Sequence, residues 1–469
     1  MNIKTRIYIL LLLLWAGGLQ AQHYSLYNSG TLAESVENPW VSVFEDACGI
    51  VASNFFIPTI NGDGFLQGDA AQGGREYIFW NRKVPPLGNL QNKNHVNLYN
   101  HLNVITVKYL YDEATQTEFL FDHSVKSMSA ATVKNITVNL AQGGSFPGTA
   151  PLAPSDGPVN TNLFHYLYSA TTIGARRRFD ETFAAGVSLS YLSGIAHYDV
   201  GIGFSQGTYD SANDAIDFNI RGQAEYTTYP NRLGIGDFLP SFRNPGFAIS
   251  GGIEKKMNDM VKFTLAIKDL GLINWNDRGE QVILTPASTI TINNISTLSK
   301  DMAEAELRNI RANNRQLINY RTALPTRFEA GGSVALHPNY TANVLVSYLT
   351  RYKRADLNLI NDFRYGDFHL ILNAGYNSYE NLLLGLNFLI RSSRVDFFVG
   401  SDNLLPSIRV TRQVNDPNYH YNSRTAANLN FGFALRLGAC EGSGGFLEAG
   451  WLNLRDKNGR RRKEECFTF

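Results

Sequence analysis

Residues 246–275 carry the pattern that most restricts the fold, because apolar side chains alternate one by one with small or polar ones on both sides of the segment 257–260. A repeat of two residues places successive side chains on opposite faces of a β-strand. Each run holds about ten residues or more, which is the strand length that crosses a bilayer at a tilt. The pattern therefore predicts one hairpin of a transmembrane β-barrel.

The same alternation recurs along most of the chain and is clearest in residues 428–437. One face of that segment comprises Leu429, Phe431, Phe433, Leu435 and Leu437. The segments number about sixteen, within the range of single-chain barrels. We therefore expect an all-β, up-and-down antiparallel transmembrane barrel of about 14–16 strands over residues 97–437.

Composition agrees with a surface that meets lipid. Charged residues make up only 18% of the 469 residues, whereas aromatic residues reach 12%. Soluble domains carry about 25% charged residues, and outer-membrane barrels need aromatic girdles at both interfaces. The formal net charge of +1 gives no field that would attract nucleic acid, so no nucleic-acid partner is expected.

The N-terminus has the form of an export signal. Lys4 and Arg6 precede an apolar run over 7–16, and small residues lead to Ala21. This predicts a secretory signal peptide over 1–21, which is too short to be a spanning helix. Residues 22–96 are expected to form a periplasmic lead-in or a plug, and residues 438–469 a periplasmic C-terminal tail.

The lengths of the connections suggest an orientation. Short turns are predicted at 178–181, 257–260 and 337–340, and long loops at 141–160, 276–326 and 401–425. Outer-membrane barrels have short periplasmic turns and long extracellular loops. Within the second long loop, residues 299–320 have apolar residues at helical spacing behind Ser299, which predicts a helix. Such a helix would cover the barrel mouth or act as a gate or docking element.

No catalytic, cofactor-binding or metal-binding residues are predicted. Imidazole and carboxylate lie close together in residues 122–123 and 197–199, but adjacent residues of a strand point to opposite faces. We therefore expect no local dyad, no cofactor and no enzymatic activity. Cys48, Cys440 and Cys466 lack the spacing of metal ligands. Cys440 and Cys466 would form a disulfide, or all three thiols would be free.

Other polar and aromatic residues have structural interpretations. The arginines at 176–178 are expected to form an interfacial cluster that holds a turn in water. Lys268 and Asp269 would line a pore or form a strand-end salt bridge. Trp275 is expected to belong to an aromatic girdle, together with the strand-end residues Tyr191, Tyr352 and Tyr376.

Four segments resemble a known family. They are Asn38-Pro39-Trp40, residues 172–194 (TIGARRRFDETFAAGVSLSYLSG), residues 247–275 with Lys268-Asp269-Leu270-Gly271, and residues 323–333 (ALPTRFEAGGS). The chain resembles a Gram-negative outer-membrane β-barrel family of unknown function that is related to FadL-like and PorV/PorP-like barrels. The resemblance implies a monomeric barrel of fourteen strands and no catalytic residues.

The expected function is non-enzymatic and the expected location is the cell outer membrane, in contact with its lipid. The protein would act as a FadL-like channel for small apolar or amphipathic solutes, or as a PorV/PorP-like scaffold with secretion or surface proteins as partners. A secreted or periplasmic all-β binding protein is the alternative. Strands of about ten residues or more argue against the alternative, since strands in globular proteins usually hold about five or six.

Overall fold

The computed structural model describes the barrel and part of the chain before it. The described residues are 26–41, 43–44, 50–69, 92–135, 159–210, 215–227, 234–277, 279–293, 314–351, 354–377, 381–392, 394–405, 407–408, 412 and 425–438. The predicted signal peptide, most of the first long loop, the tail after residue 438 and all three cysteines lie outside them. None of the described helices is long and apolar enough to cross a membrane.

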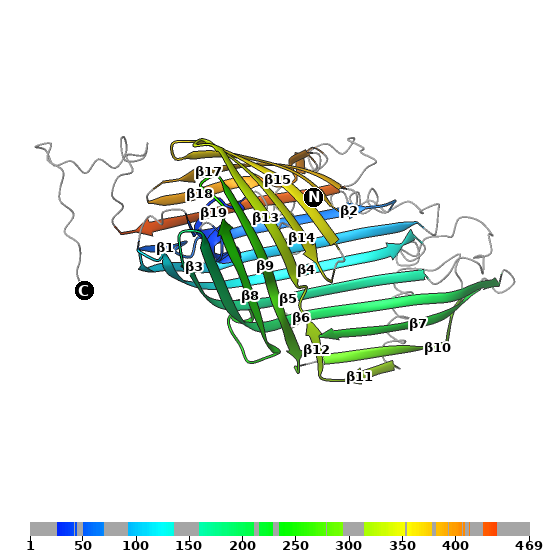
Figure 1. Cartoon of the computed structure of the whole chain (residues 1–469). Coiled ribbons are helices and arrows are strands. Elements are labelled where there is room, and N and C mark those ends of the chain that lie inside the picture. The colour runs from blue at the N-terminus through cyan, green and yellow to red at the C-terminus, as the bar shows by residue number, and fades with distance from the viewer. Residues whose placement is uncertain are drawn as a thin grey trace, which may run out of the picture.

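The fold is a closed antiparallel barrel of 14 strands (Figure 1). In ring order the strands are β2 (Thr59–Gln67), β3 (Lys93–Asp112), β4 (Thr117–Lys134), β5 (Val159–Arg178), β6 (Phe183–Asp210), β8 (Pro245–Lys256), β9 (Val261–Trp275), β13 (Arg327–His337), β14 (Tyr340–Leu349), β15 (Arg354–Tyr365), β16 (Phe368–Asn377), β17 (Asn381–Arg391), β18 (Val395–Ser401) and β19 (Thr425–Leu437). The ring closes where β19 pairs with β2, with Phe431 opposite Ile60. The predicted barrel class is confirmed.

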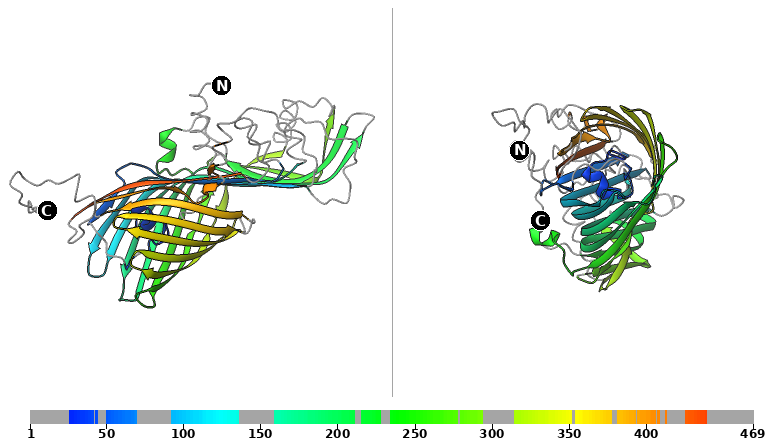
Figure 2. Two further views of the ribbon diagram at one scale, coloured as in Figure 1. Left: turned by 90° about the horizontal axis from the view of Figure 1, so that it is seen from above. Right: turned by 60° about the vertical axis from the view of Figure 1, so that its left-hand side comes forward.

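Five further strands extend this ring. β1 (Val51–Ser53) pairs with both β3 and β19 beyond the end of β2. β7 (Ala215–Thr227), β10 (Gly279–Asn293) and β11 (Arg315–Leu317) continue the sheet from the far half of β6, and Figure 2 shows them projecting past the barrel. β12 (Tyr320–Ala323) pairs with the last residues of β9, in line with β13.

Apolar side chains cover the outside of the barrel. On β9 Phe263, Leu265 and Ile267 are exposed, while Thr264, Ala266 and Lys268 between them are buried. The same alternation runs along β14, β15 and β16. Because burial here means facing the lumen, the apolar faces predicted from the sequence are the exterior faces. This is the arrangement that a lipid environment requires.

A β-bulge in β9 reverses this alternation. Ile249 on β8 pairs with Leu270, but Gly251 pairs with Ile267, so two residues of β9 face Ser250 alone. The extra residue is Asp269, whose φ of 54° is left-handed, and its backbone N–H donates to Ser250 Oγ at 2.9 Å. A bulge of one residue moves every later side chain to the other face. Trp275 therefore points into the lumen, and its prediction as a girdle residue is wrong.

The predicted short turns lie at one end of the barrel as expected, although the connections 350–353 and 378–380 at the other end are equally short. The short connections 113–116, 179–182, 257–260, 338–339 and 366–367 each join consecutive strands at the same end of the barrel. The longer connections, including those that carry β7, β10 and η1 (Ile235–Phe238), lie at the other end. We call the two ends the short-turn end and the loop end.

The count of about sixteen segments was too high, and the fourteen strands implied by the family resemblance are confirmed. β4 and β6 hold 18 and 28 residues, so each was counted as two strands of bilayer length. β7 was counted as a ring strand, although it pairs with β10 beyond the ring, and β10 lies within the predicted long loop 276–326.

The barrel also begins earlier than the predicted boundary at residue 97. β2 lies between β3 and β19 as a full member of the ring. Its sequence, TINGDGFLQ, contains two glycines and an aspartate, which obscured the alternation. In the predicted helix over 299–320, residues 315–317 form β11 and residue 320 begins β12, while 299–313 lie outside the described residues.

A charge on the exterior should destabilise the barrel according to its height in the wall. Leu265 and Leu336 are both 57% exposed, but Leu336 lies next to a short turn and Leu265 lies farther up the wall. Leu265→Arg should lower the free energy of unfolding from lipid vesicles by about 2–4 kcal/mol, and Leu336→Arg by about 0–1 kcal/mol. Equal losses for the two variants would contradict a lipid-facing wall.

Candidate functional site

Residues 26–41, which we call the plug, lie inside the barrel, as Figure 2 shows for α2 (Leu32–Glu37). Leu26, Trp40 and Val41 are each 1% exposed. They pack in one apolar cluster with Tyr27 and with lumen-facing residues of the wall, namely Ala266, Leu345, Ile360, Ile371, Leu383, Leu389 and Phe398. The plug therefore supplies the apolar core of this part of the lumen.

The plug is folded by its own polar contacts. Thr31 caps α2, and its Oγ1 accepts a hydrogen bond from the backbone N–H of Glu34 at 3.2 Å. The Glu34 carboxylate reaches back and accepts from the backbone N–H groups of Asn28 and Gly30. This exchange is a variant of the capping box. It satisfies backbone donors that would otherwise be buried without partners.

Three wall glycines leave the space into which the plug fits. A Cβ atom on Gly186 of β6 would lie 2.2 Å from the carbonyl oxygen of Pro39, and one on Gly252 of β8 would lie 2.5 Å from the Trp40 ring. A Cβ atom on Gly331 of β13 would lie 2.1 Å from the Tyr27 hydroxyl. These distances are far below van der Waals contact, so the wall at these points accepts only glycine while the plug is in place.

Charged side chains hold the C-terminal end of α2. Glu37 Oε1 lies 2.5 Å from His101 Nδ1, and Glu37 Oε2 lies 3.3 Å from Arg327 Nη2. Lys268 donates to Asn38 Oδ1 and forms an ion pair with Glu329 at 2.8 Å. These groups come from β3, β9 and β13, so the network ties the plug to separate parts of the ring. Removing one partner of a buried pair costs about 3–5 kcal/mol because the other charge is left uncompensated.

Arginines from the wall bind backbone carbonyls of the plug. Arg176 donates to the carbonyl of Val41 at 3.0 Å, Arg391 to that of Ser29 at 3.1 Å and Arg436 to that of Gly30 at 3.0 Å. Arg176 was predicted to belong to an interfacial cluster at a turn. It is 5% exposed and pairs with Glu118 instead, because residue 176 faces the lumen.

The ring strand beside α2 is interrupted. β1 and β2 occupy the same place between β3 and β19, but residues 54–58 between them leave the sheet. The Asn54 side chain replaces part of the missing strand, because its Oδ1 accepts from the backbone N–H of Thr106 at 2.9 Å. Phe55 and Phe56 have φ angles of 47° and 62° and are 47% and 69% exposed. Two aromatic side chains are thus held outward in strained backbone conformations.

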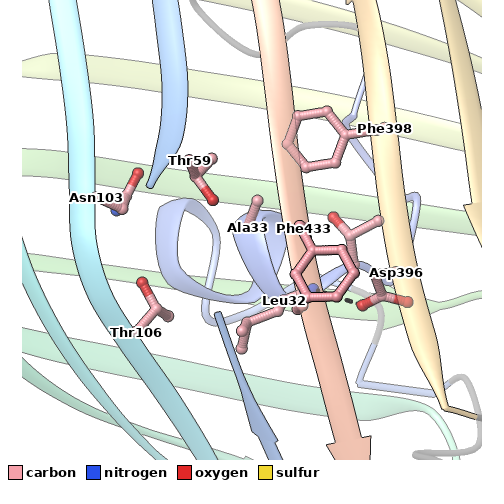
Figure 3. A pocket seen from close by; sticks show the side chains of 10 residues that line it. Leu32, Ala33, Thr59, Asn103, Thr106, Asp396, Phe398 and Phe433 are labelled. Carbon is pink, nitrogen blue, oxygen red and sulfur yellow. Dashed lines mark hydrogen bonds between the residues drawn. The ribbon is translucent and has the colours of Figure 1, made fainter. Parts of the chain in front are cut away.

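α2 covers this interruption from inside the barrel. Figure 3 shows Leu32 and Ala33 between Thr59 and Thr106 on one side and Phe398 and Phe433 on the other. The backbone N–H of Leu32 donates to Asp396 Oδ2 at 3.2 Å. The cavity between helix and wall measures about 10 Å³, no more than one water molecule needs. The plug therefore seals the wall closely here.

An aromatic cluster fills the lumen toward the loop end. The Trp275 ring stacks on His197 at 5.0 Å between centroids, and Tyr320 OH lies 2.9 Å from His197 Nδ1. Trp275 Nε1–H donates to Thr322 Oγ1 at 2.8 Å. His197 is 0% exposed. The cluster joins the barrel to the strands that project beyond it.

The structure separates the imidazole–carboxylate combinations seen in the sequence. Asp199 pairs with Arg351 rather than with His197. His123 contacts Thr171 Oγ1 and the carbonyl of Phe238, each at 3.0 Å. Asp122 accepts hydrogen bonds from Asn103 and Thr106.

Lys268 and Asp269 both lie in ion pairs, Lys268 with Glu329 and Asp269 with Lys126 at 3.2 Å. They lie within β9 rather than at a strand end. Within the described part of the chain, no three His, Cys, Asp or Glu side chains are grouped so that they could hold a metal ion.

A second cavity, of about 530 Å³, lies on the exterior. Its walls include the exposed residues Leu265, Ile267, Phe328, Val346 and Tyr348 from β9, β13 and β14. It is therefore a depression in the apolar surface and is separate from the lumen.

The plug was not located by sequence reasoning, although one local signal was present. Thr31 and Glu34 have the spacing of a capping box. Contacts of the plug with the wall such as Asn28–Ser333 and Asn38–Lys268 join residues more than 200 positions apart, and no local pattern encodes them.

A family model matches residues 61–402. The chain belongs to the family of unknown function DUF5723. This match and the barrel confirm the resemblance to an outer-membrane barrel family of unknown function. No curated protein matches the sequence.

The solved barrel structures that this chain matches have low sequence identity to it. A mutant of the monoaromatic hydrocarbon channel TodX has 8% identity and a TM-score of 0.45, with 86% of this chain and 93% of that chain covered. A FadL homologue from Pseudomonas aeruginosa has 8% identity and a TM-score of 0.43, with 88% and 95% covered. The Pseudomonas putida toluene transporter TodX has 8% identity and a TM-score of 0.42, with 86% and 92% covered.

Adding a methyl group at Gly186 should displace the plug. In Gly186→Ala the new Cβ would meet the backbone of Pro39 at 2.2 Å, so the plug rather than the wall has to move. We expect faster hydrogen exchange in residues 26–41, measured by mass spectrometry. Gly332→Ala is the matched control, because its Cβ has no neighbour closer than 3.6 Å. Unchanged exchange in Gly186→Ala would show that the plug does not depend on this close fit.

Proposed function

We propose that the protein is an integral outer-membrane barrel without enzymatic activity that acts, as a monomer, as a channel for small apolar or amphipathic solutes. The plug is the observation that carries this proposal. It occupies the lumen, and side-chain contacts rather than strand pairing hold it in place. Side-chain contacts can break and re-form without opening the ring, so the plug can serve as the gate.

The exterior supports the location in the membrane. The exposed residues of β9, β14, β15 and β16 are largely apolar, and ionisable residues on these strands lie mainly on the lumen side. Such a surface is stable in hydrocarbon and unstable in water. A secreted or periplasmic binding protein would not present it.

The interruption at residues 54–58 supports passage of apolar solutes. Among the described residues, only this segment and α2 separate the lumen from the apolar exterior at that height of the wall. Movement of α2 would give a solute an apolar exit beside Phe55 and Phe56. The imidazoles of His123 and His197 are engaged in structural contacts, which supports a role without catalysis.

A scaffold is the second candidate function, and the projecting sheet favours it. β7, β10 and β11 extend past the ring at the loop end, where a protein of a secretion or surface complex could reach them. Affinity capture from detergent-solubilised membranes should then recover a defined partner. Recovery of the barrel alone would count against the scaffold.

Locking the plug should stop transport. Asn28 Nδ2 donates to Ser333 Oγ at 3.0 Å, so cysteines at these two positions place thiols on neighbouring side chains of the plug and β13, and loss of free thiols on oxidation shows that the disulfide has formed. With the native cysteines replaced by serine, oxidised Asn28→Cys/Ser333→Cys protein in vesicles should lose uptake of a small apolar solute, and a reductant should restore it. The two single-cysteine variants are the controls. Undiminished uptake by the locked protein would exclude the plug as the gate.

A further inference from the structure

A continuous row of asparagines crosses the inner wall of the barrel. The row, which we call the amide row, comprises Asn358 of β15, Asn373 of β16, Asn387 of β17, Asn430 of β19 and Asn61 of β2. Asn430 and Asn61 are directly paired, and Asn387 and Asn430 flank Gly400 of β18. Asn358 pairs with Gly375, two residues from Asn373, and Asn373 pairs with Gly385, two residues from Asn387. All five side chains face the lumen and are buried.

Much of the hydrogen-bonding capacity of this row is unused. In the part of the chain that the structure describes, neither polar side-chain atom of Asn358 or Asn373 has a hydrogen-bond partner, although these residues are 0% and 3% exposed. The side-chain oxygens of Asn430 and Asn61 also lack partners. Asn387 is the exception, since it donates to Asp402 and accepts from Asn430. Buried carboxamides without partners are costly, so these positions require a hydrogen-bonding partner in the lumen.

Glycines beside the row let the amides lie against the wall. A Cβ atom on Gly375 would lie 2.2 Å from Asn358 Oδ1, and one on Gly400 would lie 2.3 Å from Asn387 Oδ1. Any larger residue at either position would push the neighbouring amide out of place. The two glycines thus leave space on the inner wall for the side chains of Asn358 and Asn387.

An apolar surface adjoins the amide row. Ile360 pairs directly with Asn373, and Leu345 with Asn358. Both belong to the wall side of the apolar cluster that the plug covers through Leu26, Tyr27, Trp40 and Val41. A solute that replaced the plug would therefore find an apolar surface next to a row of neutral hydrogen-bonding groups.

Several charged groups of the lumen are already in ion pairs, and the buried carboxylate of Asp402 accepts hydrogen bonds from Asn387 and Asn430 of the row. Lys108 pairs with Glu118 at 3.2 Å, Lys268 with Glu329 at 2.8 Å and Arg436 with Asp396 at 2.9 Å. Arg354, at the loop end of β15, pairs with Asp356 at 2.6 Å. A carboxylate solute would bring an unpaired negative charge into the lumen near Asp402 unless it broke one of these pairs. A hydroxyl group can donate to an amide oxygen and accept from an amide nitrogen without adding charge.

We propose that the amide row binds the uncharged, hydroxyl-bearing head group of an amphipathic solute whose apolar part packs on the surface that the plug now covers. The inference rests on the proposed channel and narrows its solute class. Neutral alcohols and glycosides are favoured over fatty-acid anions of equal chain length.

Binding of two matched probes tests this inference. Full-length protein in a zwitterionic detergent is titrated with hexyl glucoside and with hexanoate, and binding is followed by calorimetry. We expect hexyl glucoside to bind roughly tenfold more tightly than hexanoate, because each lost pair of hydrogen bonds is worth about one order of magnitude in affinity. Equal affinity for the two probes, or no binding of hexyl glucoside, would overturn the proposal.

Variants with substitutions in the amide row provide a second test of the proposal. Asn358→Leu/Asn373→Leu should weaken hexyl glucoside binding roughly tenfold or more. Asn361→Leu alters an amide outside the row on the same strand and should bind as the unmodified protein does. If the double leucine variant does not fold, Asn358→Ser/Asn373→Ser removes the same amides with less change in polarity. Unchanged binding of hexyl glucoside by a folded double variant would contradict the proposal.

The outcomes separate the two hypotheses. Binding that depends on the row, without uptake into vesicles, would support the amide row as a binding site and reject the channel. Plug-dependent uptake that is the same in the double variant and the unmodified protein would support the channel and reject the amide row as its binding site.

Discussion

Pairing of every backbone amide around a closed ring is the constraint on which this structure depends. Hydrocarbon offers no water to bond with exposed N–H and C=O groups, so a sheet in a bilayer cannot keep a free edge. The chain meets this requirement by pairing β19 with β2 and, farther along, with β1. At the break between these two strands the side chain of Asn54 binds the backbone of β3. Even the irregular part of the wall therefore has hydrogen-bond partners.

The lumen combines two kinds of contact that act differently. Glycines of the wall leave space into which Tyr27, Pro39 and Trp40 fit. Ion pairs and hydrogen bonds from arginines to carbonyl groups fix the position of the plug around the ring. Buried ion pairs add little net stability because their desolvation is expensive. They penalise any arrangement that leaves one charge alone, and so they define one seated position of the plug.

The exterior of the barrel could be predicted from the sequence because it obeys a local rule. Phe263, Leu265 and Ile267 face outward as their alternation requires. The rule failed where the backbone departs from regular pairing. The bulge at Asp269 carried Trp275 inside, and the glycines of β2 concealed a ring strand. Long strands such as β6 were divided, since nothing local marks where a strand leaves the membrane.

The interior could not be predicted, because its contacts join distant parts of the chain. Arg176 appeared to be one of three adjacent arginines at a turn, yet its partners are Glu118 and the carbonyl of Val41. The plug was one of two alternatives for residues 22–96, and its contacts with β9, β13 and β19 have no counterpart in any short motif. The capping residues Thr31 and Glu34 were the one local sign of its helix.

The order of the segments along the chain has a consequence for biogenesis. The plug comes just before β1 and β2, so it is attached beside the seam at which these strands meet β19. Because side-chain contacts rather than strand pairing hold residues 26–41, this segment can enter the lumen after the ring has closed. Closure of the seam and seating of the plug can therefore occur as separate steps, and the second step seals the lumen.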